Sequence, residues 1–217
     1  MTAPETACPN CGATIRFRWT QAAQTTCTYC KSILVRTNLD WNRVGVVAEL
    51  PATSSPIQLG TTGVWRDRGF TVVGRILYRW SRGRWNEWHC GLDDGSSAWL
   101  SDAQLQYTMS AIHSETVELP DASAIRRTDA CRFGTERYVV TTVTEASFDG
   151  VEGELPFEYW DKSTCKFADL TGEHGRFATI DYSESPPLVF VGESLAFRAL
   201  KLQNLVIFDG WPIPAVR

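Results

Sequence analysis

Two pairs of cysteines near the start of the chain constrain its fold more than any other feature. Cys8 and Cys11 form one Cys-x-x-Cys pair, Cys27 and Cys30 form a second, and 15 residues separate the pairs. This spacing is typical of a zinc ribbon, in which two tight turns direct four thiolates at one tetrahedral ion. Four protein ligands leave no open position for water or substrate, so we predict a zinc ion that organises structure and performs no chemistry.

Two other interpretations of these cysteines are weaker. A redox Cys-x-x-Cys motif normally occurs singly, at the start of a helix, whereas this chain has two such pairs. Iron in the same ligand set is a lesser alternative. We therefore predict a zinc ribbon over residues 1–45, and we expect its folding to require the metal because so short a segment gains little from packing alone.

Composition and charge limit the classes of protein to which the chain can belong. No secretory signal and no run of about 18 apolar residues is present, so we expect a cytoplasmic protein without a membrane span. The net charge of −4 argues against a dedicated nucleic-acid binder. The charge is uneven: residues 1–110 contain 11 Lys and Arg against 8 Asp and Glu, and the remainder contains 10 against 17. These opposite charges would permit a homo-oligomer.

The middle of the chain predicts an antiparallel meander. Residues 70–80 are rich in β-branched and aromatic side chains, a turn follows at 81–84, and residues 85–92 resume the alternation of a strand. A second turn at 93–95 leads to a third strand, after which Ser101 and Asp102 predict a short helix that ends at Tyr107. We assign these elements to a first β module over residues 57–112.

The second half repeats this pattern. Residues 137–144 resemble the strand at 70–80, and residues 167–182 give a strand, a turn and a strand. We predict a second antiparallel module over residues 125–217, and a diverged duplication and chance convergence explain the likeness equally well. The predicted fold class is a small all-β protein: a zinc ribbon followed by two barrel or sandwich-like modules.

No motif for catalysis is present. The chain lacks a nucleophile elbow, a phosphate-binding loop and a dinucleotide fingerprint. Cys90, Cys131 and Cys165 each alternate with large apolar residues, which favours small buried hydrophobes over nucleophiles. We therefore predict that the protein is not an enzyme.

A few acidic residues and a histidine offer a weaker enzymatic alternative. Glu87 and His89 share one face of a strand and would pair as a base and its orienting group, although solvated pairs of this kind are common. The corresponding pocket would contain Glu87, His89, Asp181 and Glu184.

Arginine and tryptophan alternate along the hairpin at residues 65–94, and this mixture predicts a binding surface. Such residues are enriched at protein interfaces, and they also stack single-stranded bases and neutralise phosphates. The competing interpretation is an ordinary hairpin whose arginines are solvated or pair with nearby acids. The residues we assign to partner binding are Arg79, Trp80, Arg82, Arg84 and Trp85.

Taken together, these strings resemble a bacterial zinc ribbon joined to the family called domain of unknown function 4178. The residues that carry the resemblance are 8–12, 27–30, 70–76, 85–88, 99–101, 153–156, 168–170, 181–184 and 186–187. Lys31 departs from the pattern, because a glycine often follows the second cysteine pair. The resemblance implies a β-rich protein without assigned catalytic residues, in a setting of stress or phage defence.

The expected function is therefore that of a non-enzymatic interaction or adaptor protein in a multi-component bacterial system, with another protein as its partner. The alternative is a single-stranded nucleic-acid binder that uses the ribbon and the hairpin at 65–94.

Overall fold

A computed structural model describes residues 4–37, 40–47, 50, 55–115, 117–158 and 164–207 of the chain. Within these residues, the regular structure consists of β-strands and two short 3-10 helices, η1 (Glu173–Gly175) and η2 (Phe197–Leu200). The predicted all-β class is confirmed. None of the helices in this part of the chain has the length and hydrophobicity that crossing a bilayer requires.

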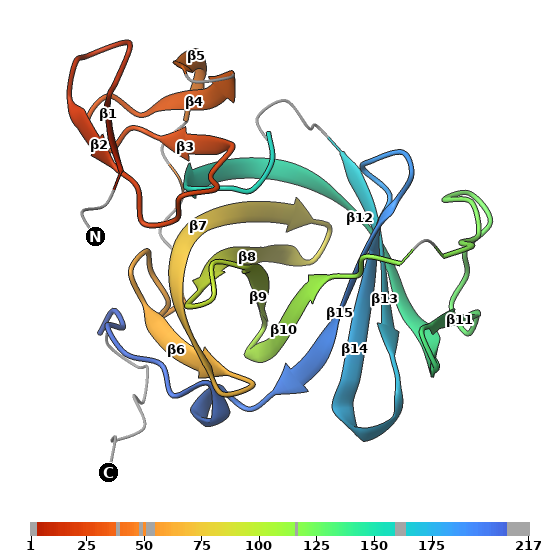
Figure 1. Ribbon diagram of the computed structural model, residues 1–217. Helices are drawn as coiled ribbons and strands as arrows, with labels where there is room; N and C mark the ends of the chain where they lie inside the picture. The colour runs from red at the N-terminus through yellow and green to blue at the C-terminus, as the bar shows by residue number, and fades with distance from the viewer. Residues whose placement is uncertain are drawn as a thin grey trace.

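The N-terminal segment folds as two small antiparallel sheets beside the larger sheet (Figure 1). One cysteine pair lies in the turn between the first two strands, and the other lies in the turn between the third and fourth. The strands are β1 (Glu5–Ala7), β2 (Thr14–Arg16), β3 (Gln24–Thr26), β4 (Ser32–Thr37) and β5 (Asp40–Val46). The last strand ends one residue beyond the predicted ribbon, 1–45.

Eight longer strands form two antiparallel meanders, each with four strands in chain order. One meander lies within the predicted module 57–112, and the other lies within 125–217. The first contains β7 (Arg68–Trp80), β8 (Gly83–Leu92), β9 (Ser97–Ala103) and β10 (Gln106–Ile112), and the second contains β12 (Glu136–Gly153), β13 (Cys165–Thr171), β14 (Arg176–Asp181) and β15 (Leu188–Leu195).

The two meanders are halves of one closed ring, which corrects the prediction of two separate barrels or sandwiches. β10 pairs with β15 and β7 pairs with β12, so the sheet returns to its starting strand. Each meander alone would leave two edges of unpaired backbone groups, and pairing between the meanders removes all four edges. The result is a single eight-stranded antiparallel barrel.

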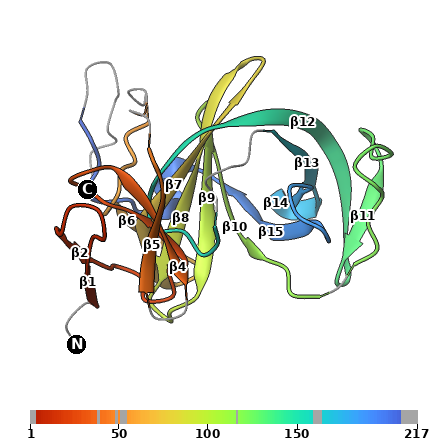
Figure 2. The same ribbon diagram turned by 90° about the horizontal axis from the view of Figure 1, so that it is seen from above.

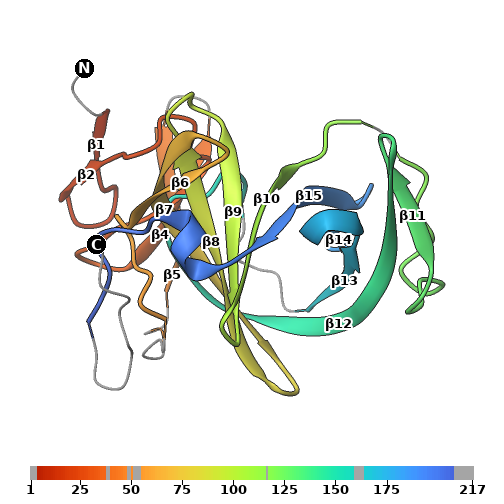
Figure 3. The same cartoon turned by 90° about the horizontal axis from the view of Figure 1, so that it is seen from below.

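β12 is long enough to serve both meanders. Its first part, Val139–Ala146, pairs with β13, and its second part, Ser147–Gly153, pairs with β7. Each part contains a β-bulge, which bends the strand and increases its twist. Figures 2 and 3 show the result, since β12 curves from one meander across to the other.

The helix predicted at residues 101–107 is wrong. This segment is the end of β9, a turn and the start of β10, and the turn residues Gln104 and Leu105 have φ values of 52° and 68°. Two positive φ values at the centre of a two-residue loop are characteristic of a type I′ hairpin turn. Pairing of β9 with β8, and of β10 with β15, outweighs the local capping signal.

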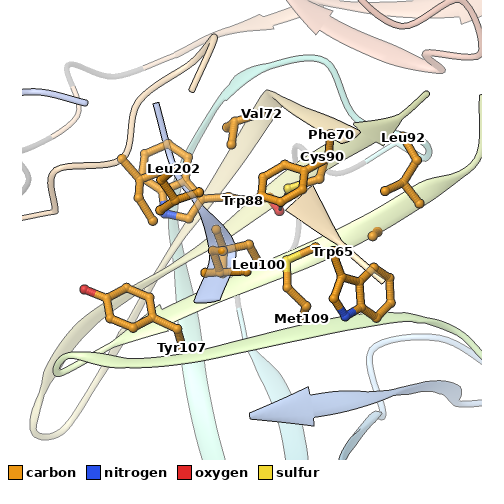
Figure 4. Close-up of a cluster of buried hydrophobic side chains, with 13 residues drawn as sticks. Trp65, Phe70, Val72, Trp88, Cys90, Leu92, Leu100, Tyr107, Met109 and Leu202 are labelled. Carbon is orange, nitrogen blue, oxygen red and sulfur yellow. Dashed lines mark hydrogen bonds between the residues drawn. The ribbon is translucent and has the colours of Figure 1, made fainter. Parts of the chain in front are cut away.

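Hydrophobic side chains cover the outside of both meanders. β6 (Thr62–Trp65) and the η2 segment cover the first, and β11 (Ala130–Phe133) with the residues before it covers the second. The first cluster, shown in Figure 4, includes Trp65, Phe70, Val72, Trp88, Cys90, Leu92, Leu100, Tyr107, Met109 and Leu202. The second includes Ile125, Cys131, Phe133, Tyr138, Val140, Leu170, Ile180 and Val189. Because these apolar faces point outward, the opposite face of each strand points into the ring.

The three cysteines outside the ribbon are buried in hydrophobic clusters, as predicted. Cys90 and Cys131 lie in the two outer clusters, and Cys165 lies with the interior side chains. Burial raises the pKa of the Cys90 and Cys131 thiols, so both remain protonated near neutral pH.

Candidate functional site

The four cysteine sulfurs of the ribbon converge on one point. The Sγ atoms of Cys8 and Cys30 are 3.6 Å apart, those of Cys11 and Cys27 are 3.8 Å apart, and all four lie within 4.8 Å of one another. A tetrahedral site with Zn–S bonds of about 2.3 Å has sulfur–sulfur edges of about 3.8 Å. The four predicted ligands therefore form one cluster that could hold a metal ion, and two of its sulfur–sulfur distances are close to a tetrahedral edge.

The two turns that carry the cysteines have the same hydrogen-bond pattern. In the first, Gly12 N–H donates to the Cys8 carbonyl, and in the second, Lys31 N–H donates to the Cys27 carbonyl. Gly12 has a φ of 75° and Lys31 a φ of 58°, so both residues adopt the left-handed conformation. Lys31, the departure from the family pattern, thus occupies a position that favours glycine.

A buried carboxylate fixes the ribbon to the barrel. Glu154, which follows β12, accepts hydrogen bonds from the backbone N–H groups of Arg18 at 2.8 Å and Trp19 at 2.7 Å. Beside it, Leu155 exchanges backbone hydrogen bonds with Gln24 of β3. A Cβ at Gly74 would overlap the Glu154 carbonyl, so only glycine permits this close crossing.

The inside of the barrel holds a partly enclosed cavity of about 270 Å³. Along the strands of the ring, side chains that line the cavity alternate with side chains that belong to the outer clusters, as the pleat of a β-strand requires. Aromatic and polar side chains share this wall. The aromatic lining residues are Tyr78, Trp80, Trp85, Trp99, Phe157, Phe167, Phe177 and Phe190. The uncharged polar lining residues include Ser101, Gln104, Gln106, Thr108, Ser110, Thr142, Thr144 and Thr179.

Several of these rings contact each other directly. Tyr78 and Trp85 stack with their centroids 4.9 Å apart, and the edge of Phe167 packs against both rings. Trp99 and Phe157 stack at 5.6 Å. These ring contacts restrict the orientations of the side chains that make them.

Three carboxyl groups, those of Glu87, Asp169 and Asp181, face the same cavity. Glu87 Oε1 accepts hydrogen bonds from Trp85 Nε1 and Ser101 Oγ, both at 2.8 Å, and Asp169 Oδ1 accepts one from Thr179 at 2.9 Å. Asp181 Oδ1 accepts a hydrogen bond from the Ser183 backbone. These contacts hold each carboxyl group in a fixed orientation against the wall.

Burial changes the ionisation of two of these groups. It raises the pKa of Glu87 to about 7, with smaller contributions of the same sign from Asp169 and Asp181. It likewise raises the pKa of Asp169 to about 6. Glu87 is half-buried rather than fully buried, because part of its surface faces the cavity.

The structure does not bring together all four residues of the predicted enzymatic pocket, which were Glu87, His89, Asp181 and Glu184. Glu87 and Asp181 line the cavity, whereas Glu184 is exposed in the turn after β14. His89 is fully buried next to the ribbon, and its Nδ1 and Nε2 lie 2.7 Å from the Glu154 carbonyl and Ser97 Oγ. Burial lowers the pKa of His89 to about 4, so the ring is neutral at physiological pH.

The residues predicted to bind a partner lie at the β7–β8 hairpin, but two of their rings turn inward. Trp80 and Trp85 line the cavity. Arg79 and Arg84 both pair with Asp149, at 3.2 and 2.6 Å, and the Arg82 guanidinium lies 5.5 Å from the Trp80 ring centroid. The alternation of Arg and Trp thus separates an ion-paired surface from an aromatic interior.

Sequence reasoning missed Asp169 and the cavity as a whole. Asp169 lies between the outward-facing Ala168 and Leu170, and the same alternation places Thr179 and Asp181 on the inner face of β14. The available signal was a pair of neighbouring strands on which Asp169, Thr179 and Asp181 share one face. Only the ring closure shows that this face is enclosed.

The family described as domain of unknown function (DUF4178) matches residues 58–197, more than half of the 217 residues. The chain belongs to this family. The matched segment contains every strand of the barrel, so the resemblance noted in the sequence is confirmed there, and the four ribbon cysteines lie outside it. No curated protein and no solved structure matches the chain.

Proposed function

We propose that this protein is a non-enzymatic binding protein whose barrel holds a small molecule. The cavity is the observation that supports this function. An eight-stranded barrel has an interior just wide enough to be filled by side chains or to hold one small ligand, and here about 270 Å³ remains open among aromatic and polar side chains. Strands carry most of the lining, which favours a preformed site.

The lining also favours binding over covalent chemistry. Among the described residues that face the cavity, there is no Cys, His or Lys. The carboxyl groups therefore lack the usual neighbours of an activated nucleophile. We assign them to recognition.

A fragment experiment tests this function. Saturation-transfer NMR with fragments of about 6–12 non-hydrogen atoms detects weak ligands of the zinc-loaded, full-length protein. We expect several fragments to compete for one site and to lose binding in Thr144→Phe, which places a ring at the cavity wall and reduces the open volume. The matched control is Thr171→Phe, the same change at an exposed position outside the lining. Equal binding to both variants would place the fragments elsewhere and contradict the proposal.

We further propose that the four cysteines hold zinc in a structural role. The donor set supports this, because four clustered thiolates suit Zn²⁺ and, as its four ligands, would leave no position for a substrate. When bound, the ion would cross-link the two cysteine turns and would take no part in a reaction. Elemental analysis of the purified protein should give one zinc per chain, and iron in its place would contradict the assignment.

An adaptor role stays a second proposal. Residues 81–84 at the tip of the β7–β8 hairpin are exposed, which supports contact with another protein at that position. The nucleic-acid alternative has less support, because Asp149 neutralises Arg79 and Arg84 while Trp80 and Trp85 face the cavity. A gel shift with single-stranded DNA at low and high salt tests the latter, and binding that weakens in Arg82→Ala would favour it.

A further inference from the structure

The charges around the barrel cavity are strongly one-sided. Glu87, Asp169 and Asp181 come from three different strands and face one space. Among the described residues that line this space, Arg84 alone is basic, and its guanidinium is bound to Asp149 by the 2.6 Å ion pair. Glu87 and Asp169 therefore face the cavity, and no basic side chain from the described part of the wall pairs with them.

Two carboxyl oxygens remain available to a ligand. The hydrogen bonds to Glu87 all reach Oε1, and the bond to Asp169 reaches Oδ1. Within the described residues, no hydrogen bond reaches Glu87 Oε2 or Asp169 Oδ2. Glu87 and Asp169 are both half-buried, so these oxygens face the partly enclosed cavity, where a cationic group could donate a charge-assisted hydrogen bond to them.

The aromatic wall favours the same kind of ligand. Tyr78, Trp80 and Trp85 form one connected group of rings, with the Trp80 and Trp85 centroids 6.4 Å apart. Rings around a carboxylate attract a cation through their negative faces, and this arrangement recognises alkylated ammonium groups. A hydrated metal ion gains little from such apolar walls, whereas an organic cation contacts both rings and carboxylates.

The volume limits the size of the ligand. Sites for drug-sized molecules measure about 300–1,000 Å³, and this cavity is slightly smaller at about 270 Å³. A compact alkylammonium ion fits this limit.

From these observations we propose that the barrel cavity binds a small organic cation, with its ammonium group at Glu87 and Asp169 and its alkyl part against the aromatic rings. This inference rests on the proposed binding function and specifies its ligand class.

The experiment compares ligands of the same shape and different charge. Choline is matched with neutral 3,3-dimethylbutan-1-ol and anionic 3,3-dimethylbutanoate, and n-hexylammonium is matched with 1-hexanol. Affinities for the zinc-loaded protein are measured by calorimetry and by the fluorescence of the cavity tryptophans, at about pH 8, where Glu87 is ionised. We expect at least one cation to bind about tenfold more tightly than its neutral counterpart.

Three variants locate the charge that is responsible. Glu87→Gln and Asp169→Asn retain the oxygens that accept from Trp85, Ser101 and Thr179, so the wall geometry is kept. Each should weaken cation binding about tenfold and change the affinity of the neutral ligand by less than about threefold. The control Glu173→Gln removes the same charge from an exposed turn and should leave binding unchanged.

The outcomes separate this inference from the function on which it rests. Equal binding of the cation and its neutral counterpart would overturn the cation assignment and leave the binding function intact. Cation binding that survives both Glu87→Gln and Asp169→Asn would also overturn it. If no ligand of this set binds at up to about 10 mM, which detects even millimolar affinity, then the cation inference fails, and the fragment experiment decides the proposed function. Thermal melting of each variant verifies that it is folded.

Discussion

Glu87 should destabilise the protein at alkaline pH, and its replacement by glutamine measures how much. Burial raises the pKa of Glu87 from an ordinary 4.5 to about 7. The folded state therefore holds a proton that the unfolded state releases between these two values, so the stability of the wild type falls as the pH rises through this window. Glutamine has nearly the same shape and cannot ionise.

The expected magnitude follows from the pKa difference. A shift of about 2.5 units corresponds to about 3 kcal/mol at 1.36 kcal/mol per unit. Glu87→Gln should thus stabilise the ligand-free protein by up to about 3 kcal/mol near pH 8, or by about 6–12 °C in Tm for a chain of this size. Near pH 5 most of this gain disappears, leaving less than about 1 kcal/mol, because Glu87 is protonated in the folded state.

The assay is denaturant unfolding of both proteins with zinc present, at about pH 5 and pH 8. The difference between variant and wild type at each pH cancels the dependence of zinc affinity on pH, since both proteins share the ribbon. A gain that is equal at the two pH values would refute the assigned role of Glu87 ionisation. A loss of stability near pH 8 would refute it more strongly, because it would show that the wall already satisfies the charge.

The remaining predictions concern the metal, the ribbon and the ligand. Cys30→Ser should abolish stoichiometric zinc binding and unfold the ribbon, while the β signal of the barrel in circular dichroism persists. Loss of the barrel signal as well would show that the ribbon and the barrel fold as one unit. Lys31→Gly should tighten zinc binding and Gly12→Ala should weaken it, each by about 1 kcal/mol, because both positions have a positive φ. Competition with a chromophoric chelator measures the zinc affinity of each variant. Affinity changes of the same sign would contradict the role of the positive φ. Glu154→Ala should destabilise the protein by about 3 kcal/mol through loss of two charge-assisted hydrogen bonds. The control is Glu173→Ala at an exposed position, and an equal loss of stability in both variants would show that Glu154 does not fix the ribbon to the barrel. Binding of choline near pH 6.5 should release protons, because a cation favours ionised Glu87 and Asp169, and calorimetry in buffers of different ionisation enthalpy would show no such dependence if neither group titrates.

The features that the sequence predicted correctly are local ones. The cysteine turns, the hairpin at 81–84 and the strands β7 and β8 each depend on residues that are neighbours in the chain. Spacing and alternation alone specify such elements. The helix at 101–107 failed because strands on both sides, one of them β15, determine its conformation.

Ring closure was not predictable in the same way. The pairing of Tyr107 with Leu195 joins segments that are far apart in the chain, and no local pattern marks such a contact. The inner face of β8 was equally hidden. Trp88, Cys90 and Leu92 look like the core side of a strand that has one solvated face, which would leave Glu87 in water. Because β6 and η2 bury that apolar face on the outside, Glu87 lies inside the barrel instead.

A chain of aromatic contacts connects the ribbon to the cavity and gives the metal site a place in the proposed function. Trp19 of the ribbon packs its ring against His89 at 4.7 Å, His89 contacts Trp99 at 5.2 Å, and Trp99 lines the cavity and stacks on Phe157. His89 is held neutral by burial, so this chain carries no charge toward the carboxyl groups. The position of Trp19 in turn depends on the hydrogen bond from its backbone to Glu154. On the proposed function, an ion that orders the ribbon would therefore also support one wall of the cavity, and loss of the metal would be expected to weaken ligand binding in the barrel.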